Sequence, residues 1–303
     1  MEICVIMSTF NGERFIRQQL DSIFQSSKNH DIFLYVRDDG STDNTVNILK
    51  KYANDNNVKI QIDENKNIGS ACSFLSAMRE CPIADYYAFC DQDDIWINGK
   101  LDTAILRLGI SKVPTLWFSD YQVTDSKLNI LVSSGLKAPI QDSIKAIFYN
   151  NVPGCTMVFN LALMNELRKI NIKEIRMHDI MTINIALLTG KVIFEKKPYV
   201  LYRQHDSNVL GYNHKKVKPI KWLIDKLELI YHKENYSTSE YAKAILNSFS
   251  QFMTDSQKHE YELISEMNRS IFSRLKVLNK SYTKEKFGRT SISIRLKILL
   301  NII

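Results

Sequence analysis

The feature that most constrains the fold is a regular alternation of short apolar runs with helix-like segments in the first third of the chain. The strand-like runs cover residues 2–8, 32–38, 58–63 and 86–91, and the helix-like segments between them cover residues 13–26, 43–55 and 69–81. Apolar residues in the helix-like segments recur at helical spacing, whereas the runs are rich in β-branched and aromatic residues. This alternation predicts an α/β fold with a mainly parallel sheet.

Small polar or acidic residues follow all four strand-like runs. They lie in residues 8–13, 37–43, 64–70 and 91–96. One such segment is ordinary turn chemistry. Open parallel sheets, however, bind ligands at the carboxyl ends of their strands. Four polar ends that converge on one edge therefore predict a site for a polar ligand.

The residues after the fourth run predict that a bound metal ion, and not a glycine-rich loop, contacts the phosphates of the ligand. Neither G-x-G-x-x-G after the first run nor G-x-x-x-x-G-K-[ST] occurs, but Asp91, Asp93 and Asp94 fall within four positions. Carboxylates can hold Mg²⁺ or Mn²⁺, which then binds phosphates. Because side chains at i and i+2 of an extended segment point the same way, we expect Asp91 and Asp93 to face one point, with Asp94 directed elsewhere. The alternative is a simple cap of a helix beginning near Trp96, which needs only one carboxylate.

Composition and cysteine usage are those of a globular intracellular protein. Hydrophobic residues make up 45% and charged residues 24% of the 303 residues, enough for one large domain or one with an appendage. The five cysteines are odd in number and form no C-x-x-C pair, which predicts reduced thiols. The chain begins without a signal-peptide pattern and has no apolar stretch long enough to span a bilayer. We therefore expect a cytoplasmic location.

Positive charge is concentrated in the last third of the chain. Residues 215–303 hold 17 Lys and Arg against 9 Asp and Glu, whereas the first 214 residues hold 23 against 24. A basic region of this kind favours contact with an anionic surface, nucleic acid or membrane; the alternative is a solvated charged face. Helical patterns at 220–232, 239–252 and 258–279 predict that 215–303 is a helical appendage to a domain formed by 1–214.

The last fifteen residues, 289–303, predict an amphipathic helix. The apolar positions that share one helical face are Ile292, Leu296, Leu299, Leu300 and Ile303. The segment is too short to span a bilayer but could lie in the interface of an anionic membrane. The alternative is a last helix packed on the catalytic domain.

Seven motifs occur in an order and spacing that resembles a known enzyme family. They are TFNGERFIRQQLDSI, VRDDGSTDNT, NKNIGSACSF, FCDQDDIW, VPGCTMVFN, MHDIMTINIA and YRQHDSNVLG, and together they cover residues 1–211. The set is similar to the family 2 inverting glycosyltransferases of the GT-A fold, and within them to bacterial rhamnosyltransferases of surface-polysaccharide synthesis. This resemblance implies a nucleotide-sugar half over residues 1–110 and an acceptor half over 111–214.

The resemblance also implies roles on the donor side. The implied nucleotide-binding residues are Thr9, Asn11, Glu13, Asp38, Asp39, Asn67, Gly69, Asp91 and Gln92. Among them Asp38 or Asp39 would bond the uracil or thymine ring, and Gln92 is the middle residue of the D-x-D motif. The implied ligands of Mg²⁺ or Mn²⁺ are Asp93, Asp91 and His205.

On the acceptor side the resemblance implies one base and one pocket. An acceptor hydroxyl must lose a proton as it attacks the anomeric carbon. The implied base is Asp179, and His178 is the next candidate because an ordinary histidine pKa also suits a base. Arg203 would pair with the diphosphate, while Asp206 stands where similar sequences have a small residue. The implied acceptor-pocket residues are Trp96, Gly154, Cys155 and Thr156.

The resulting functional hypothesis is a metal-dependent inverting transferase. It would move L-rhamnose from dTDP-rhamnose to a glycan or lipid-linked acceptor, at the inner face of the cell membrane and without a nucleic-acid partner. Donor alternatives are UDP-galactose, UDP-glucose and UDP-N-acetyl sugars. Alternatives of another class are a nucleotidyltransferase, which usually has a glycine-rich basic loop after the first strand, and a non-catalytic sugar-binding relative.

Overall fold

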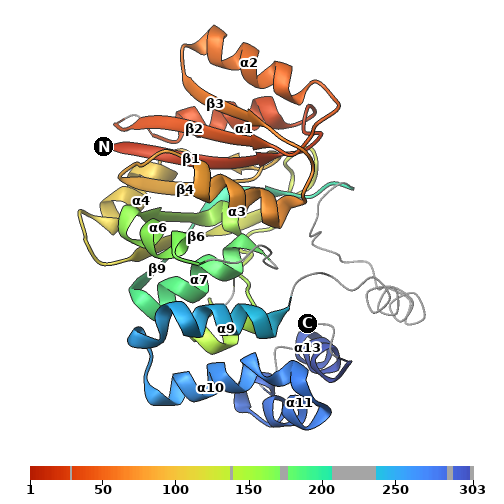
Figure 1. The fold of residues 1–303 in the computed structure, drawn as a ribbon. Helices are drawn as coiled ribbons and strands as arrows, with labels where there is room; N and C mark the ends of the chain where they lie inside the picture. Colours follow the sequence, from red (N-terminus) through yellow and green to blue (C-terminus); the bar gives the residue numbers. More distant parts are fainter. Residues whose placement is uncertain (28, 137–138, 171–176, 207–236, 285–288, 301–303) are drawn as a thin grey trace.

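The computed structural model describes the chain except for residues 28, 137–138, 171–176, 207–236, 285–288 and 301–303. Among the described residues, nine strands form one sheet (Figure 1). Its main path runs, in spatial order, through β3 (Lys59–Glu64), β2 (Asp31–Asp38), β1 (Glu2–Thr9), β4 (Tyr86–Cys90), β8 (Met157–Asn160), β6 (Thr115–Thr124), β9 (Lys191–Arg203) and β5 (Ile95–Trp96). The ninth strand, β7 (Ile130–Val132), pairs with β6 outside this path.

The first four strands are parallel, as the alternating pattern predicts. β1 pairs in parallel with both β2 and β4, and β2 pairs in parallel with β3. The register places Thr9 opposite Asp38, and Asp38 opposite Glu64, so that the carboxyl ends of three strands are level. β8 then enters antiparallel between β4 and β6. The predicted α/β fold with a mainly parallel sheet is confirmed.

Helices cover both faces of the sheet. α1 (Ile16–Gln25), α2 (Thr45–Asn56) and α4 (Lys100–Leu108) pack on one face; α3 (Ser70–Glu80), α5 (Ser143–Phe148), α6 (Leu161–Arg168) and α7 (His178–Thr189) belong to the core on the other. Successive side chains of β1 alternate between the two cores: Val5 lies in the first, and Cys4 and Ile6 lie in the second. Burial on both faces explains why the strands read as continuous apolar runs.

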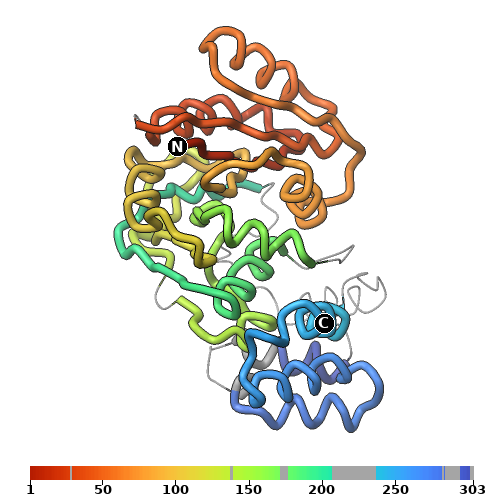
Figure 2. The backbone as a smooth tube through the Cα atoms, turned by 60° about the vertical axis from the view of Figure 1, so that its left-hand side comes forward, coloured from red at the N-terminus to blue at the C-terminus, as the bar shows by residue number. Residues whose placement is uncertain are grey.

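The C-terminal helices lie at the opposite end of the molecule from β3 and α2 (Figures 1 and 2). They are α9 (Thr238–Phe249), α10 (Asp255–Ser265), α11 (Ile271–Leu278), α12 (Ser281–Lys284) and α13 (Arg289–Leu300). The single helix expected over 258–279 is wrong, because a 3₁₀ turn at Met267–Arg269 ends it and the Ser270 side chain caps α11. The helix expected over 220–232 lies outside the described residues.

A buried polar cluster joins these helices to the sheet layers. Asn184 of α7 donates to the Ser143 carbonyl at 2.6 Å and to the Tyr261 hydroxyl at 2.8 Å, and it accepts from the Tyr241 hydroxyl at 3.0 Å. All four residues are buried, and the amide uses both its hydrogens and its oxygen. Since a satisfied polar network in a core specifies one packing, Asn184 fixes how α9 and α10 dock on α7.

The last helix both packs and exposes apolar residues. Ile298 of α13 is fully buried and Ile294 packs against the same core. Three leucines of the predicted apolar face remain exposed: Leu296 at 39%, Leu299 at 39% and Leu300 at 51%. Ile292 and Ile303 of that face lie outside the described side chains. Within the described part of the chain, no helix combines the length and apolar character that crossing a membrane requires.

Candidate active site

The polar segments after β1, β2 and β3 meet at one edge of the sheet and are tied together by backbone bonds. The amide of Asp39 donates to the Thr9 carbonyl at 2.7 Å, and the amide of Asn65 donates to the Asp38 carbonyl at 3.0 Å. The strands therefore continue to pair just past their ends. This is the arrangement that the sequence predicts for a ligand site at the carboxyl edge.

Asp38 shapes the turn after β2. Its buried carboxylate accepts from the Thr9 hydroxyl at 2.8 Å, the Ser41 amide at 2.8 Å and the Ser41 hydroxyl at 2.6 Å. Gly40 inside this turn has φ = 86°, which favours glycine. The carboxylate thus preorganises the loop against β1.

Asp39 holds the segment after β3 over the sheet edge. It accepts from Arg37 Nη1 at 2.5 Å and from the amides of Ile68 at 3.0 Å and Gly69 at 2.9 Å. The Asn67 side chain also accepts from the Gly69 amide. Since protein groups already surround both Asp38 and Asp39, a bond from either to a uracil or thymine ring stays a prediction.

Three further residues of the predicted nucleotide set fasten neighbouring loops. Asn11 accepts from the Thr42 amide at 2.8 Å, and Glu13 accepts from the Asn44 amide at 2.9 Å, which binds the loop after β1 to the start of α2. The Gln92 amide accepts from the Phe10 amide at 2.9 Å and donates to the Phe10 carbonyl at 3.0 Å. The loops after β1, β2 and β4 therefore form one bonded unit.

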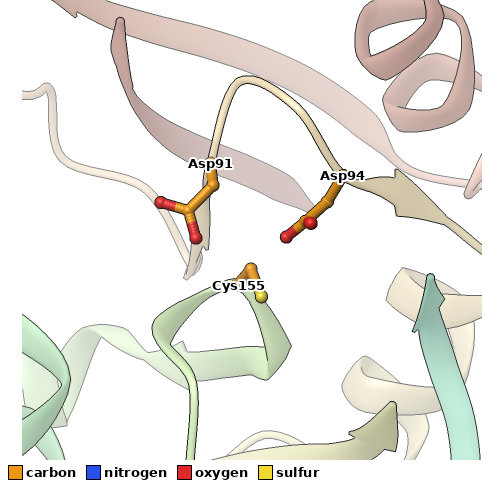
Figure 3. Close-up of side chains that lie close together, drawn as sticks. All are labelled: Asp91, Asp94 and Cys155. Atoms are coloured by element: carbon orange, nitrogen blue, oxygen red, sulfur yellow. The ribbon is translucent and has the colours of Figure 1, made fainter. Parts of the chain in front are cut away.

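The acidic segment after β4 differs from the geometry expected of it. Residues 91–94 form a bend rather than an extended strand. Asp91 and Asp94 point toward Cys155 (Figure 3), and ligand atoms of these three residues lie within 4.8 Å of one another. The Asp93 carboxylate contacts His205, with Oδ2 and Nε2 2.8 Å apart. The expectation that Asp94 points elsewhere is wrong, because residues 91–94 bend and the i, i+2 rule holds only for extended backbone. That Asp91 and Asp93 face one point stays a prediction.

Asp94 is not a helix cap. It is followed by β5, and α4 begins only at Lys100. Its Oδ1 accepts from the Arg203 amide at 3.0 Å, which ties the acidic turn to the end of β9. Burial, followed by the nearby charges of Asp93 and Asp91, raises the pKa of Asp94 well above its usual range.

The environment of Asp91 disfavours its ionised form. Burial raises the pKa of Asp91 to about 7, and the carboxylates of Asp93 and Asp179 add to the shift. Lys100 acts in the opposite direction. Burial and the two neighbouring carboxylates therefore outweigh Lys100, and Asp91 takes up a proton more readily than an ordinary aspartate.

Lys100 is a functional candidate that sequence reasoning missed. It is fully buried, its Nζ donates to the Cys155 carbonyl at 2.5 Å, and it lies 3.5 Å from the centroid of the Trp96 ring. Trp96 is itself buried in the core beneath the turn. The only signal in the sequence is a lysine in the first turn of a helix that follows an acidic cluster.

Arg203 has a different environment from the one predicted. Its guanidinium is buried and donates to the Asp93 carbonyl at 2.8 Å, the Ser126 carbonyl at 3.1 Å and Gln18 Oε1 at 2.8 Å. A guanidinium held in this way anchors the acidic turn, and its pairing with a diphosphate stays a prediction. His205 beside it stacks on Phe15, with ring centroids 4.6 Å apart.

His178 is a core side chain. Its ring stacks on Phe74 with centroids 3.9 Å apart, and burial lowers its pKa to about 3. Neither ring nitrogen has a hydrogen-bond partner among the described residues. A Cβ at Gly154 would lie 2.2 Å from His178 Nε2, so the ring requires glycine there. Such a neutral, enclosed imidazole does not suit the role of base.

Asp179 follows His178 in the first turn of α7. Its side chain is only partly buried, and its Oδ1 accepts from the Ile180 amide at 2.6 Å. Its charge acts on Asp91, which places it beside the acidic turn. The predicted pocket residues Gly154, Cys155 and Thr156 form a buried 3₁₀ turn before β8, next to the same carboxylates.

Comparison with known proteins decides the family. A sequence profile described as Glycosyl transferase family 2 matches residues 4–113. A dTDP-rhamnosyl transferase of Shigella flexneri is 31% identical over 223 residues, which cover 68% of this chain and 74% of the relative. The chain belongs to glycosyltransferase family 2. Membership of this family argues against the two alternatives, a nucleotidyltransferase and a non-catalytic sugar-binding relative. The chain is a glycosyltransferase.

Solved structures agree with the fold of this glycosyltransferase. Staphylococcus aureus TarS 1–349, solved with UDP-GlcNAc, has a TM-score of 0.53 at 14% identity and aligns with 100% of this chain and 90% of its own. A mannosyltransferase of Pyrobaculum calidifontis, solved with GDP-Man and Mn²⁺, has a TM-score of 0.52 at 18% identity and aligns with 99% of this chain and 87% of its own. The GT-A type of fold implied by the motifs is therefore confirmed.

Proposed function

We propose that this glycosyltransferase moves a sugar from a nucleoside diphosphate to an acceptor hydroxyl with inversion, with L-rhamnose from dTDP-rhamnose as the favoured donor. The observation that carries the proposal is the meeting of three features at one sheet edge. These are the bonded loops after β1, β2 and β4, the acidic turn 91–94 and the partly buried Asp179. The loops supply a rigid donor site, and the two acidic features supply the chemistry.

The proposed reaction is a single displacement. Asp179 takes the proton of the acceptor hydroxyl, whose oxygen forms the bond to the anomeric carbon as the bond to the diphosphate oxygen breaks. Asp179 can serve because it is only partly buried, whereas His178 is enclosed and has a pKa of about 3. The nucleoside diphosphate leaves with the bonding electrons, so no acid is needed if its charge is neutralised.

The residues at the acidic turn fit a divalent cation. Asp93 Oδ2 and His205 Nε2 are 2.8 Å apart, close to the ~3 Å that separates adjacent ligands around an octahedral ion with bonds of about 2.1 Å. Burial raises the pKa of Asp91 to about 7, and the neighbouring carboxylates of Asp93 and Asp179 add to the shift, so a nearby cation would favour its ionised form. Mg²⁺ or Mn²⁺ held by Asp93, His205 and Asp91 would neutralise the developing charge on the leaving diphosphate.

The choice of donor rests on similarity. The relative from Shigella flexneri is named as a dTDP-rhamnosyl transferase, and the UDP-GlcNAc and GDP-Man structures share only the fold with this chain. We therefore favour dTDP-rhamnose, with UDP-galactose, UDP-glucose and UDP-N-acetyl sugars as alternatives. The acceptor is proposed to be a glycan or a lipid-linked oligosaccharide of surface-polysaccharide synthesis.

A donor panel tests the proposal. The full chain is incubated with each nucleotide sugar, Mn²⁺ and a bacterial lipid extract as acceptor source, and released dTDP or UDP is quantified. We expect release from dTDP-rhamnose that depends on the extract and is lost in Asp179→Asn. Release of UDP from a UDP-sugar, without release of dTDP from dTDP-rhamnose, would identify that UDP-sugar as the donor. No release from any nucleotide sugar would contradict the proposed activity.

We further propose that α13 rests on the cytoplasmic leaflet, where a lipid-linked acceptor would lie. Leu296, Leu299 and Leu300 are exposed, and α11, which packs against α13, exposes Phe272 at 74%. Residues 269–303 hold nine Lys and Arg against one acidic residue, Glu285. Exposed apolar side chains among basic ones bind anionic interfaces through apolar burial and charge together.

Liposome sedimentation distinguishes a helix α13 that binds membranes from one that only packs against the rest of the protein. We expect the full chain to sediment with anionic vesicles, and about 0.5 M salt to weaken this by screening. Leu296→Ser with Leu299→Ser should abolish sedimentation without lowering Tm. Ile298→Ser is the packing control, since that buried side chain should lower Tm. Sedimentation unchanged by the double exposed variant would contradict the membrane role.

A further inference from the structure

Phe15 is a buried aromatic residue that the two hydrophobic cores do not account for. Its side chain is only 8% exposed. Among the described residues, however, the cores on the two faces of the sheet do not include it. Its backbone is fixed in the loop after β1, because its amide donates to the Gly12 carbonyl at 3.0 Å and α1 begins at the next residue. The burial of its ring must therefore be explained by contacts outside the cores.

The ring of Phe15 packs against two residues that both contact Asp93. The His205 imidazole stacks on it, with centroids 4.6 Å apart and ring planes inclined by 30°. The guanidinium carbon of Arg203 lies 4.6 Å from the Phe15 centroid, and that of the exposed Arg14 lies 4.9 Å from it. Arg203 also donates to the Asp93 carbonyl at 2.8 Å, and His205 Nε2 lies 2.8 Å from Asp93 Oδ2. Phe15 therefore connects the loop after β1 to the acidic turn 91–94.

The orientation of the His205 ring decides where its nitrogen atoms point. An imidazole nitrogen binds a metal through a lone pair that lies in the plane of the ring, so a histidine ligand must be held in one orientation. In many metal sites a hydrogen bond to the other ring nitrogen provides this restraint. A stacked aromatic neighbour also restricts rotation of the imidazole. Phe15 thus limits the directions in which His205 Nε2 can point.

We propose that Phe15 is a positioning residue that holds His205 Nε2 beside the Asp93 carboxylate. The inference rests on the proposed function for the role of these two groups as metal ligands. The loop that carries Phe15 also carries Asn11 and Glu13 of the proposed nucleotide set, which bond to the start of α2. One segment of the chain therefore orients groups on both the nucleotide side and the metal side of the site.

Titration with Mn²⁺ in the absence of nucleotide tests the proposal. Phe15→Leu keeps an apolar side chain but removes the flat ring, and we expect the affinity for Mn²⁺ to fall by at least about tenfold, the usual effect of losing a group that orients a metal ligand. Phe15→Tyr keeps the ring and should retain most of the natural affinity. Phe24→Leu is the matched control, because it makes the same change in α1 at a ring that stacks on Tyr52, with centroids 6.0 Å apart. It should leave the Mn²⁺ affinity unchanged.

Two outcomes of this titration would overturn the inference. One is equal Mn²⁺ affinity in Phe15→Leu and the natural chain, and the other is an equal loss of affinity in Phe24→Leu. Should Phe15→Leu not fold, Phe15→Met replaces it in every measurement. Failure of both variants to fold would show that the ring is needed for the fold as a whole, which also overturns a role limited to His205.

A double-mutant cycle in EDTA supplies a readout that needs no metal. Asp93→Ala, His205→Ala and the double variant are made in the natural chain and in Phe15→Leu, and Tm is measured for each. Since residues in contact have non-additive effects on stability, we expect coupling between positions 93 and 205 in the natural chain and its loss in Phe15→Leu. Coupling that is absent from the natural chain, or equal in both backgrounds, would overturn the inference. If the natural chain binds no Mn²⁺ but Phe15→Leu abolishes the coupling, the metal part of the proposed function fails and Phe15 keeps its positioning role.

Discussion

The carboxylates of the donor-side loops differ in their surroundings from those of the reaction centre, by which we mean the acidic turn 91–94 and Asp179. In the loops, Asp38 and Asp39 accept hydrogen bonds from three protein donors each. In the reaction centre, the pKa values of Asp91 and Asp94 are raised by burial and by neighbouring carboxylates. In the loops, protein donors satisfy the carboxylates, whereas in the reaction centre burial and neighbouring carboxylates disfavour the ionised forms. The difference supports our proposal of a preorganised donor site beside a turn that a divalent cation would complete.

The largest expected effect comes from Asp93→Ala. The variant removes the carboxylate that faces His205 Nε2 at 2.8 Å, and with it a proposed ligand of the cation. We expect transfer and metal-dependent nucleotide binding to disappear together in calorimetry of dTDP and UDP. Asp55→Ala, on the exposed face of α2, is the control and should change neither. Metal-dependent binding that survives in Asp93→Ala would remove Asp93 from the metal site.

Asp179→Asn should lose turnover and keep donor binding. The amide is nearly isosteric with the carboxylate but cannot accept the proton, so kcat should fall by about 10²–10⁴. The same protein is titrated with nucleotide to show that its donor site is intact. A decrease in kcat of less than tenfold would mean that another group is the base.

Asp39→Asn should instead act on binding and stability. It weakens the bond to Arg37 and turns an amide toward the Ile68 and Gly69 N–H groups, which should cost about 1–3 kcal/mol of unfolding free energy. We expect KM for the donor to rise with kcat nearly unchanged, since Asp39 holds the segment that contains Asn67 and Gly69 of the proposed nucleotide site. Asp55→Asn is the control. A fall in kcat at constant KM would contradict the proposal that the loops bind the donor while the acidic turn and Asp179 carry out catalysis.

The smallest expected effect is a pH-dependent one at His178. Its folded pKa of about 3 lies below the unfolded value near 6.5, so its burial destabilises the protein progressively as pH falls below 6.5. His178→Phe removes that penalty. Between pH 7 and pH 5 the variant should gain about 2 kcal/mol relative to the natural chain in denaturant unfolding. An equal slope in both proteins would show that the imidazole titrates normally.

The sheet and its edge could be predicted from the sequence because period and turn chemistry are local properties. The runs at 2–8, 32–38, 58–63 and 86–91 became β1 to β4 with small changes at their ends. The bend at residues 91–94 could not be predicted, because the direction of the chain after Cys90 depends on Arg203, more than a hundred residues away, which bonds both the Asp93 carbonyl and Asp94. A local rule for extended strands therefore failed there.

Charged residues that the fold buries were the other source of error. Arg203 was assigned to the diphosphate and Lys100 was not considered, since sequence alone does not show that both side chains are buried. His178 likewise looked like a base until its stacking on Phe74 was known. In each case tertiary burial changed the chemistry that the residue type suggests.

The central claim is that donor binding at this edge depends on a divalent cation held by the acidic turn. It is tested most directly by calorimetric titration of dTDP and UDP into the full chain, once with Mn²⁺ and once with EDTA. The account predicts tight binding with Mn²⁺, at least about tenfold weaker binding in EDTA, and no such difference in Asp93→Ala. Equal affinities with Mn²⁺ and EDTA in the natural chain would contradict it.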